Sequence, residues 1–169
     1  MDTIEAIMSR RSVRQFTNEP VTKEQIDILL HAAMQAPSAG NGQPWHFVVI
    51  QDRVTLDQIP NVHPYAQMLK EAPLAILVCG SEAQTRYANY WMLDCSAATQ
   101  NLLLAAHAIG LGSVWLGIHP NEERITCIMK LIPLPEKVHP LSLVAVGHPR
   151  EMPARTDRYK PERVHYEHW

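Results

Sequence analysis

Residues 37–45 read Pro37-Ser38-Ala39-Gly40-Asn41-Gly42-Gln43-Pro44-Trp45, with a helical pattern before them and a strand pattern after them. Pro37 ends the helical pattern, because a proline disfavours the helical conformation of the residue before it. The glycines allow the backbone N–H groups to approach a flat ligand closely. The amides of Asn41 and Gln43 can both donate and accept hydrogen bonds along the edge of a heterocycle. The stretch therefore predicts a helix, a ligand-binding loop and a strand in succession.

The segments on either side of this loop extend the pattern. Residues 22–36 predict an amphipathic helix that begins with a capping box formed by Thr22 and Gln25. Residues 45–50 predict a strand. Residues 74–79 form a continuous apolar run, which is typical of a strand buried on both faces. Helices and strands are therefore expected to alternate along the chain.

Residues 86–109 predict the longest helix, which Gly110 ends. Four of its apolar residues recur at helical spacing: Leu93, Ala97, Leu104 and Ala108. Because this helix is apolar all round, it is expected to be central. The other expected elements are helices at 3–10 and 121–130, a single helical turn at 54–59, a short helix at 65–72, and strands at 113–116 and 141–146.

The composition is that of a globular protein with a core of its own, since 46% of the 169 residues are hydrophobic and 19% are charged. A net charge of −2 does not favour a nucleic-acid or anionic-membrane surface. No apolar run is long enough for a transmembrane helix, and the acidic start is unlike a secretory signal. The three cysteines, odd in number and in apolar segments, favour reduced thiols in a cytoplasmic protein.

Three arginines and a serine stand close together in the segment Arg10-Arg11-Ser12-Val13-Arg14, at the end of the first expected helix. Guanidinium groups are forked, permanently charged donors that suit a phosphate. Cations at a helix C-terminus also stabilise ordinary surface helices, and a loop as short as 38–43 is a common connection. Neither segment alone establishes a site, but together they predict binding of a phosphorylated, planar ligand.

Other kinds of site find little support. The nine histidines include no His-x3-His pair and the chain has no Cys-x2-Cys motif, so no metal site is expected. The chain has no Gly-x-Ser-x-Gly motif, and the apolar surroundings of Cys79 and Cys95 should keep their thiols inert. Gly110-Leu111-Gly112 lacks the third glycine of a dinucleotide-binding fingerprint, and it closes a helix instead of opening one.

The last stretch, residues 151–169, differs from the rest of the chain. It mixes charges of both signs, and Pro153 and Pro161 interrupt it. It has no core of its own, yet it carries apolar side chains at Tyr159, Tyr166 and Trp169. A single domain at 1–150 is therefore expected, followed by an arm at 151–169 that wraps a partner subunit.

Six segments spread over nearly the whole chain share the pattern of one family. In chain order they are residues 10–14, 36–45, Glu71-Ala72-Pro73, 100–106, 110–117 and Gly147-His148-Pro149. In this order and spacing they resemble the nitroreductase family of FMN-dependent flavoproteins. The chain is similar to the short members, which lack the larger insertions of some relatives.

The resemblance implies an α+β fold in which helices sandwich a mainly antiparallel sheet, in an intertwined homodimer with FMN at the subunit interface. The residues implied to hold the phosphate and ribityl chain are Arg10, Arg11, Ser12, Arg155 and Arg158. Those implied to lie by the flavin ring are Arg14, Leu116, Gly117 and, as a candidate for the ring edge, Gln67. Those implied to come from the other subunit are Pro37, Ser38 and Asn41.

The implied reaction is ping-pong transfer of hydride from NADH or NADPH, through flavin N5, to a nitroaromatic, quinone or similar acceptor. No catalytic side chain is implied beyond the cofactor cradle, in which Arg14 would stabilise the negative charge of the reduced flavin. Two alternatives stay open: an enzyme of the same scaffold that destroys flavin or removes halogen, and a flavin-binding module without activity. The sequence specifies neither the physiological acceptor nor a preference between NADH and NADPH.

Overall fold

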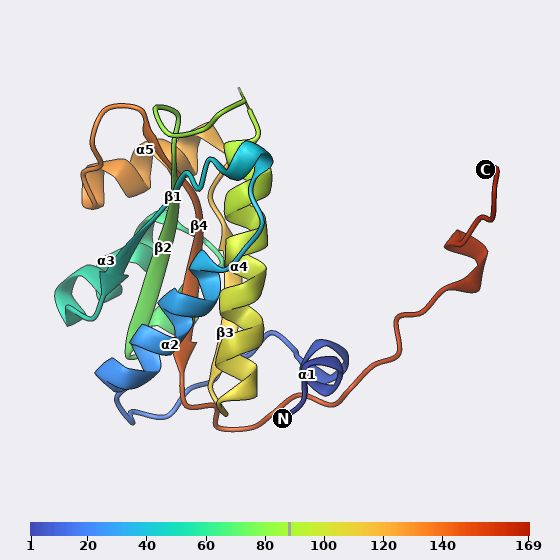
Figure 1. Cartoon of the computed structure of the whole chain (residues 1–169). Coiled ribbons are helices and arrows are strands. Elements are labelled where there is room, and N and C mark those ends of the chain that lie inside the picture. Colours follow the sequence, from blue (N-terminus) through green and yellow to red (C-terminus); the bar gives the residue numbers. More distant parts are fainter. Residues whose placement is uncertain (88) are drawn as a thin grey trace.

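The computed structural model describes residues 1–87 and 89–169, in which one antiparallel sheet lies between two layers of helices (Figure 1). The strands are β1 (Trp45–Ile50), β2 (Leu74–Ser81), β3 (Gly112–Gly117) and β4 (Val138–Gly147). They lie side by side in the order β1-β2-β4-β3, and every neighbouring pair is antiparallel. The expected α+β sandwich with an antiparallel sheet is confirmed.

The two central strands are the most apolar. β2 is buried at all of its positions, and β4 is buried from Pro140 to Gly147. Burial on both faces explains why residues 74–79 show no alternation of polar and apolar side chains. β3 lies at an edge of the sheet, beside β4.

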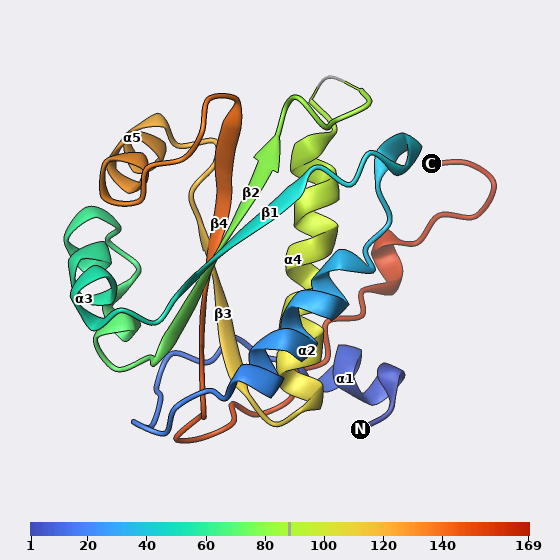
Figure 2. The ribbon, with the colours of Figure 1, turned by 60° about the vertical axis from the view of Figure 1, so that its left-hand side comes forward.

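Each face of the sheet is covered by a pair of helices, as Figure 2 shows. On one face, α2 (Lys23–Met34) and α4 (Trp91–Ala108) close a core around Leu29, Leu102 and Val144. On the other face, α3 (Arg53–Val62) and α5 (Glu122–Leu131) close a second core around Ile59 and Leu77. The short α1 (Thr3–Ser9) lies against the end of α4. Short 3₁₀ turns complete the elements at Ala39–Asn41, Gln67–Lys70 and Pro161–Arg163.

The helix starts follow local chemistry. The capping box at Thr22 and Gln25 is present, and Asn121 caps α5 by accepting a hydrogen bond from the Arg124 N–H at 2.9 Å. At residues 54–59 the expected single turn is wrong, because a ten-residue helix forms there. Its start is fixed by Asp52, whose carboxylate accepts the Thr55 N–H at 2.9 Å. The helix expected at 65–72 is only the 3₁₀ turn at Gln67–Lys70.

The longest helix, α4, is buried in this chain on one side only. It begins at Trp91, later than expected, and turns precede it at 86–87 and 89–90; the expected helix also ran over Ala88, which lies outside the described residues. Its buried side chains include Cys95, Ala98 and Leu102, whereas Leu93 is 63% exposed. The opposite side of the helix thus carries an exposed leucine and the half-buried Ala97 and Leu104.

Residues 151–169 are exposed throughout and lead away from the sheet and its helices (Figure 1). Among the described residues, no helix combines the length and the apolarity that crossing a membrane requires.

Candidate functional site

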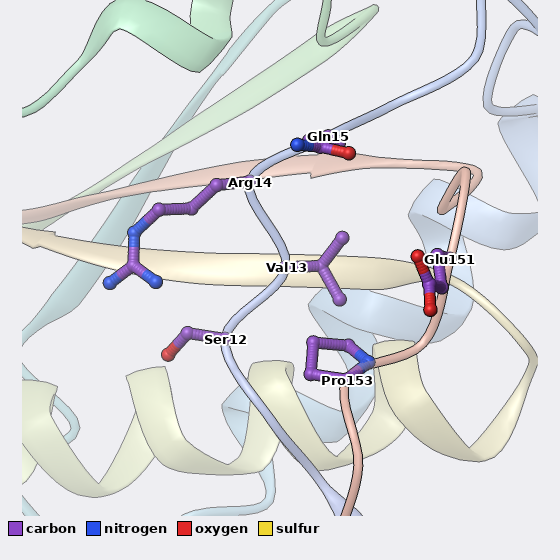
Figure 3. A pocket seen from close by; sticks show the side chains of 6 residues that line it. All are labelled: Ser12, Val13, Arg14, Gln15, Glu151 and Pro153. Atoms are coloured by element: carbon purple, nitrogen blue, oxygen red, sulfur yellow. The ribbon is translucent and has the colours of Figure 1, made fainter.

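The segment from Ser12 to Arg14 runs along the free edge of β3. Ser12 forms a parallel bridge with Ser113, and the Val13 N–H donates to the Ser113 carbonyl at 2.9 Å. Gly112 permits this approach, because a Cβ there would lie 2.7 Å from a methyl group of Val13. The side chains alternate, so that Ser12 and Arg14 project to one side and Val13 to the other (Figure 3). Together with Pro153, these residues line a cavity of about 340 Å³.

A basic cavity of about 300 Å³ lies beside this segment. Arg10, Arg11 and Arg158 all line it. Burial lowers the pKa of Arg10, and the positive charges of Arg158 and Arg11 lower it further. The carboxylate of Asp157, in the same cavity, accepts the Tyr159 N–H at 2.9 Å. Among the ion pairs of the described residues, none involves Arg10 or Arg158, so their charges are available to an anion.

Arg11 has a different part from Arg10. Its side chain is buried, and it donates to the carbonyls of Ala154 at 3.2 Å and Thr156 at 2.6 Å. It also donates to the Arg10 carbonyl at 2.8 Å. Three of its five N–H groups are thus engaged with backbone. Arg11 holds the start of the C-terminal stretch against the body of the protein.

The two arginines of the C-terminal stretch, Arg155 and Arg158, also have different surroundings. Arg155 forms an ion pair with Glu5 at 3.7 Å, whereas Arg158 enters the basic cavity beside Arg10. Of the two residues predicted to reach phosphate, Arg158 is the one that the structure places with the other cations.

A third cavity, of about 410 Å³, brings together the residues predicted to lie by a ring. Arg14, Gln67, Leu116 and Gly117 all line it. The side chain of Gln67 reaches the Pro60 carbonyl at 3.4 Å. Arg14 also lines the cavity next to Ser12, and it therefore connects the two spaces.

The free edge of β3 presents backbone groups to this third cavity. Since the Ser113 carbonyl points to Val13, alternation along the strand turns the backbone groups of Trp115 and Gly117 to the same open side. Leu116 instead faces Leu143 in the ladder with β4. The N–H groups of Trp115 and Gly117, both in the wall of this cavity, are therefore free to meet a ligand.

The Gly117 carbonyl is held by two side chains that the sequence did not single out. Nε2 of His63 and Nη1 of Arg124 each lie 3.0 Å from it. Because a carbonyl only accepts, Nε2 carries the proton of the imidazole. Burial lowers the pKa of His63, and Nδ1 has no hydrogen-bond partner among the described residues. No motif signals this contact, because 54 positions separate His63 from Gly117.

The loop at 37–43 lies elsewhere. Its Ala39 N–H donates to Asp94 at 2.9 Å near the start of α4, whereas Ser9 contacts His107 at 2.7 Å near the end of that helix. These two contacts are roughly 20 Å apart at about 1.5 Å per helical residue. Three predicted ligand residues in the loop, Pro37, Ser38 and Asn41, line none of the three cavities above.

The loop itself is well defined. The Ser38 hydroxyl accepts the Gln43 N–H at 3.1 Å, and the Asn41 carbonyl oxygen accepts the Gln43 side-chain amide at 2.8 Å. Gly40 and Asn41 both have positive φ, at 57° and 56°, a conformation in which glycine and asparagine are least strained. The loop is therefore a fixed structure that holds its polar groups at the surface.

The three cavities fit a phosphorylated planar cofactor such as FMN. The basic cavity offers unpaired guanidinium groups, and the third cavity offers a backbone N–H beside Arg14. A Cβ on Gly117 would meet nothing within 4 Å, so neither contacts nor backbone conformation in this chain require glycine there. A glycine that leaves space in a cavity wall is suited to a ligand that lies flat against the backbone.

Alternative chemistries have little basis in the described residues. No three His, Cys, Asp or Glu side chains among residues 1–87 and 89–169 come together as metal ligands would. Burial raises the pKa of Cys79 and of Cys95 to about 12, which keeps both thiols protonated and poorly nucleophilic.

Comparison with known proteins identifies the family of this chain. The sequence pattern of the Nitroreductase family matches residues 7–62 and 59–148. A Methanothermobacter thermautotrophicus protein with the provisional name NADH dehydrogenase/NAD(P)H nitroreductase is 47% identical over 169 residues, which cover 100% of this chain and 88% of that protein.

Two solved structures are also similar. A Parabacteroides distasonis protein with the same provisional name superposes with a TM-score of 0.95 at 42% identity, over 99% of this chain and 98% of its own. A Desulfovibrio desulfuricans protein, provisionally named a nitroreductase and crystallised with FMN, has a TM-score of 0.86 at 32% identity, over 100% of this chain and 98% of its own. The chain belongs to the nitroreductase family of oxidoreductases.

Proposed function

We propose that this chain is an FMN-dependent oxidoreductase that transfers hydride from NADH or NADPH to a nitroaromatic, quinone or similar acceptor by a ping-pong mechanism. The observation that carries the proposal is the arrangement along β3. A basic cavity, the segment from Ser12 to Arg14 and the N–H of Gly117 follow one another along a single edge. This order matches the order of phosphate, ribityl chain and ring in FMN.

The chain's own residues bind and orient the cofactor. Arg10 and Arg158 hold the phosphate, and the Ser12 hydroxyl, which lines the neighbouring cavity, binds the ribityl chain. Arg14 brings positive charge to the ring, where it stabilises the extra negative charge of the reduced form. When bound, FMN supplies the hydride chemistry itself. Leu116 forms the apolar part of the wall beside Gly117.

We also propose that the working unit is a homodimer with FMN at its interface. The Pro37–Asn41 loop lines none of the cavities that hold Arg10, Ser12 and Arg14, and it contacts the opposite end of α4 from Ser9, so its ligand groups would serve the partner's site. The open apolar side of α4 at Leu93 and the exposed Ile4 and Ile7 of α1 give such a dimer a surface to bury. The arm at 151–169 would then wrap the partner, outside a single domain at 1–150.

The decisive experiment is a visible spectrum of the purified protein, followed by anaerobic titration with NADH and NADPH in turn. We expect a yellow protein whose flavin band bleaches with one equivalent of nicotinamide and returns when a nitroaromatic or a quinone is added. A colourless protein that takes up no added FMN would refute the proposal.

Two other outcomes point to the alternatives. Loss of FMN during aerobic turnover would favour flavin destruction on the same scaffold. Tight FMN binding without oxidation of either nicotinamide would favour a binding module.

A further inference from the structure

We propose that His63 and Arg124 are positioning residues that fix the Gly117 peptide for the planar end of the cofactor. This inference rests on the proposed function and assigns a part in it to His63, which itself lines the cavity of about 410 Å³, and to Arg124, which does not. His63 follows α3 directly, and Arg124 lies in the first turn of α5. They approach the end of β3 from two separate helices.

The peptide between Gly117 and Ile118 has no free polar group. Its carbonyl accepts from His63 and from Arg124, both at 3.0 Å, which uses both lone pairs of the oxygen. Its N–H, on Ile118, donates to the Leu141 carbonyl at 3.1 Å. Hydrogen bonds therefore hold both the carbonyl and the N–H of this peptide.

Such support matters at this position because Gly117 has no side chain to restrict its own backbone. On its other side, Leu116 is fixed by the ladder with β4. The ladder and the two side chains together leave Gly117 one orientation, with its N–H towards the cavity of about 410 Å³. A donor that is already aimed at its ligand binds without an ordering cost.

His63 is poorly explained by packing alone. It is only 1% exposed, and its Nδ1 is buried without a partner. A buried unpartnered nitrogen destabilises a fold, so an apolar residue of the same size would be the better filler. Arg124 is itself steadied by the ring of Tyr65, whose centroid lies 5.4 Å from the guanidinium carbon.

The test compares two ligands that share a ring but differ in phosphate. FMN and riboflavin are titrated into the apoprotein, and their dissociation constants are read from flavin fluorescence. We expect His63→Phe and Arg124→Met each to weaken both ligands by the same factor, roughly fivefold for one poorly aimed hydrogen bond. The matched control is Lys130→Met, which removes an exposed cation from the same helix as Arg124 and should change either constant less than twofold.

Conservative variants separate positioning from packing. His63→Gln keeps an N–H donor but not the ring, and Arg124→Lys keeps the charge, so both should recover most of the affinity. If the two residues only pack, His63→Phe will bind like wild type and His63→Gln will not. The visible absorption maximum of bound FMN should also move in His63→Phe and stay in place in Lys130→Met.

Each contrary result has its own meaning. If the variants weaken FMN but not riboflavin, the defect lies at the phosphate end and the inference is wrong. If every variant binds both ligands like Lys130→Met, neither residue positions Gly117. If the wild-type protein binds neither flavin, the proposed function has failed before the inference is reached.

Discussion

The arginines around the basic cavity have different roles: some bind the chain itself, and others are available to an anion. Arg11 is buried against backbone carbonyls at 3.2 and 2.6 Å and serves the chain itself. Arg155 is tied to Glu5 at the surface. Arg10 and Arg158 face each other without a carboxylate partner, and this repulsion contributes to the lowered pKa of Arg10. Like charges held together in this way favour binding of an anion, which relieves the repulsion.

Arg158→Ala should therefore weaken FMN binding about tenfold or more, since one charge-assisted hydrogen bond contributes about 1.5–3 kcal/mol. Arg155→Ala is the matched control, and it should change the FMN dissociation constant less than twofold, because an exposed ion pair contributes little. Titration of FMN at two salt concentrations measures both variants. Equal losses for the two would mean that Arg158 has no special part in phosphate binding.

At the scale of elements, the contact between α1 and α4 makes stability depend on pH. His107 contacts Ser9 at 2.7 Å, and its pKa is lowered mainly by burial and next by Arg10. Because the folded pKa lies below the ordinary 6.5, the unfolded state takes up a proton first as the pH falls. The stability that neutral His107 contributes is fully present above pH 6.5. It is lost as the pH falls through the pKa of His107 in the folded protein. His63 acts in the same direction, since burial lowers its pKa as well.

The midpoint of thermal unfolding should accordingly fall when the pH is lowered from 7 to 5.5. In His107→Gln, whose amide keeps a polar contact with Ser9 but does not titrate, the fall should be smaller. Thermal unfolding followed by circular dichroism at both pH values checks this. The same fall in both proteins would show that His107 stays neutral or exposed.

The open side of α4 belongs to the same scale. A helix that must be buried on one side by its own sheet and on the other by a partner has to be apolar all round. The sequence pattern alone does not distinguish the side that packs on the sheet from the side that faces outward, since Leu93, Ala97 and Leu104 have the same spacing as the buried residues.

Leu93→Lys should leave the helical content unchanged but shift the protein from dimer to monomer, as sedimentation would measure. Val54→Lys, exposed on α3 across the sheet, is the control and should remain dimeric.

Local chemistry explains which elements could be predicted from the sequence. Capping residues and continuous apolar runs are local, so α2, β2 and the start of α5 were predicted correctly. The single turn expected at 54–59 is wrong because Asp52, which lies before that stretch, caps a longer helix. The parts of the site that lie in one motif, such as Arg10 to Arg14, could be named in advance. His63 and Arg124 could not, because only the folded sheet and helices bring them to Gly117.

For the whole molecule, the separation of the loop from Arg10 has a direct test. In a mixed dimer of Asn41→Ala and Arg10→Ala chains, one site would lose both residues and the other would keep both. We expect half of the sites in the purified mixed dimer to bind FMN with wild-type affinity, whereas each pure mutant binds weakly at both sites. If the mixed dimers recover no intact site, the loop and Arg10 serve the same site and the two-chain arrangement is wrong.

The free edge of β3 has a consequence beyond catalysis. An edge strand with outward backbone groups is a template on which a foreign strand can add itself. Ser12 and Val13 shield only its first half, and the backbone groups of Trp115 and the N–H of Gly117 remain uncovered, since His63 and Arg124 occupy the Gly117 carbonyl. A flat ring bound along this edge would cover these groups and prevent a foreign strand from pairing with β3. The cofactor would then guard the protein against aggregation, so that a cell short of flavin would lose the enzyme itself as well as its activity.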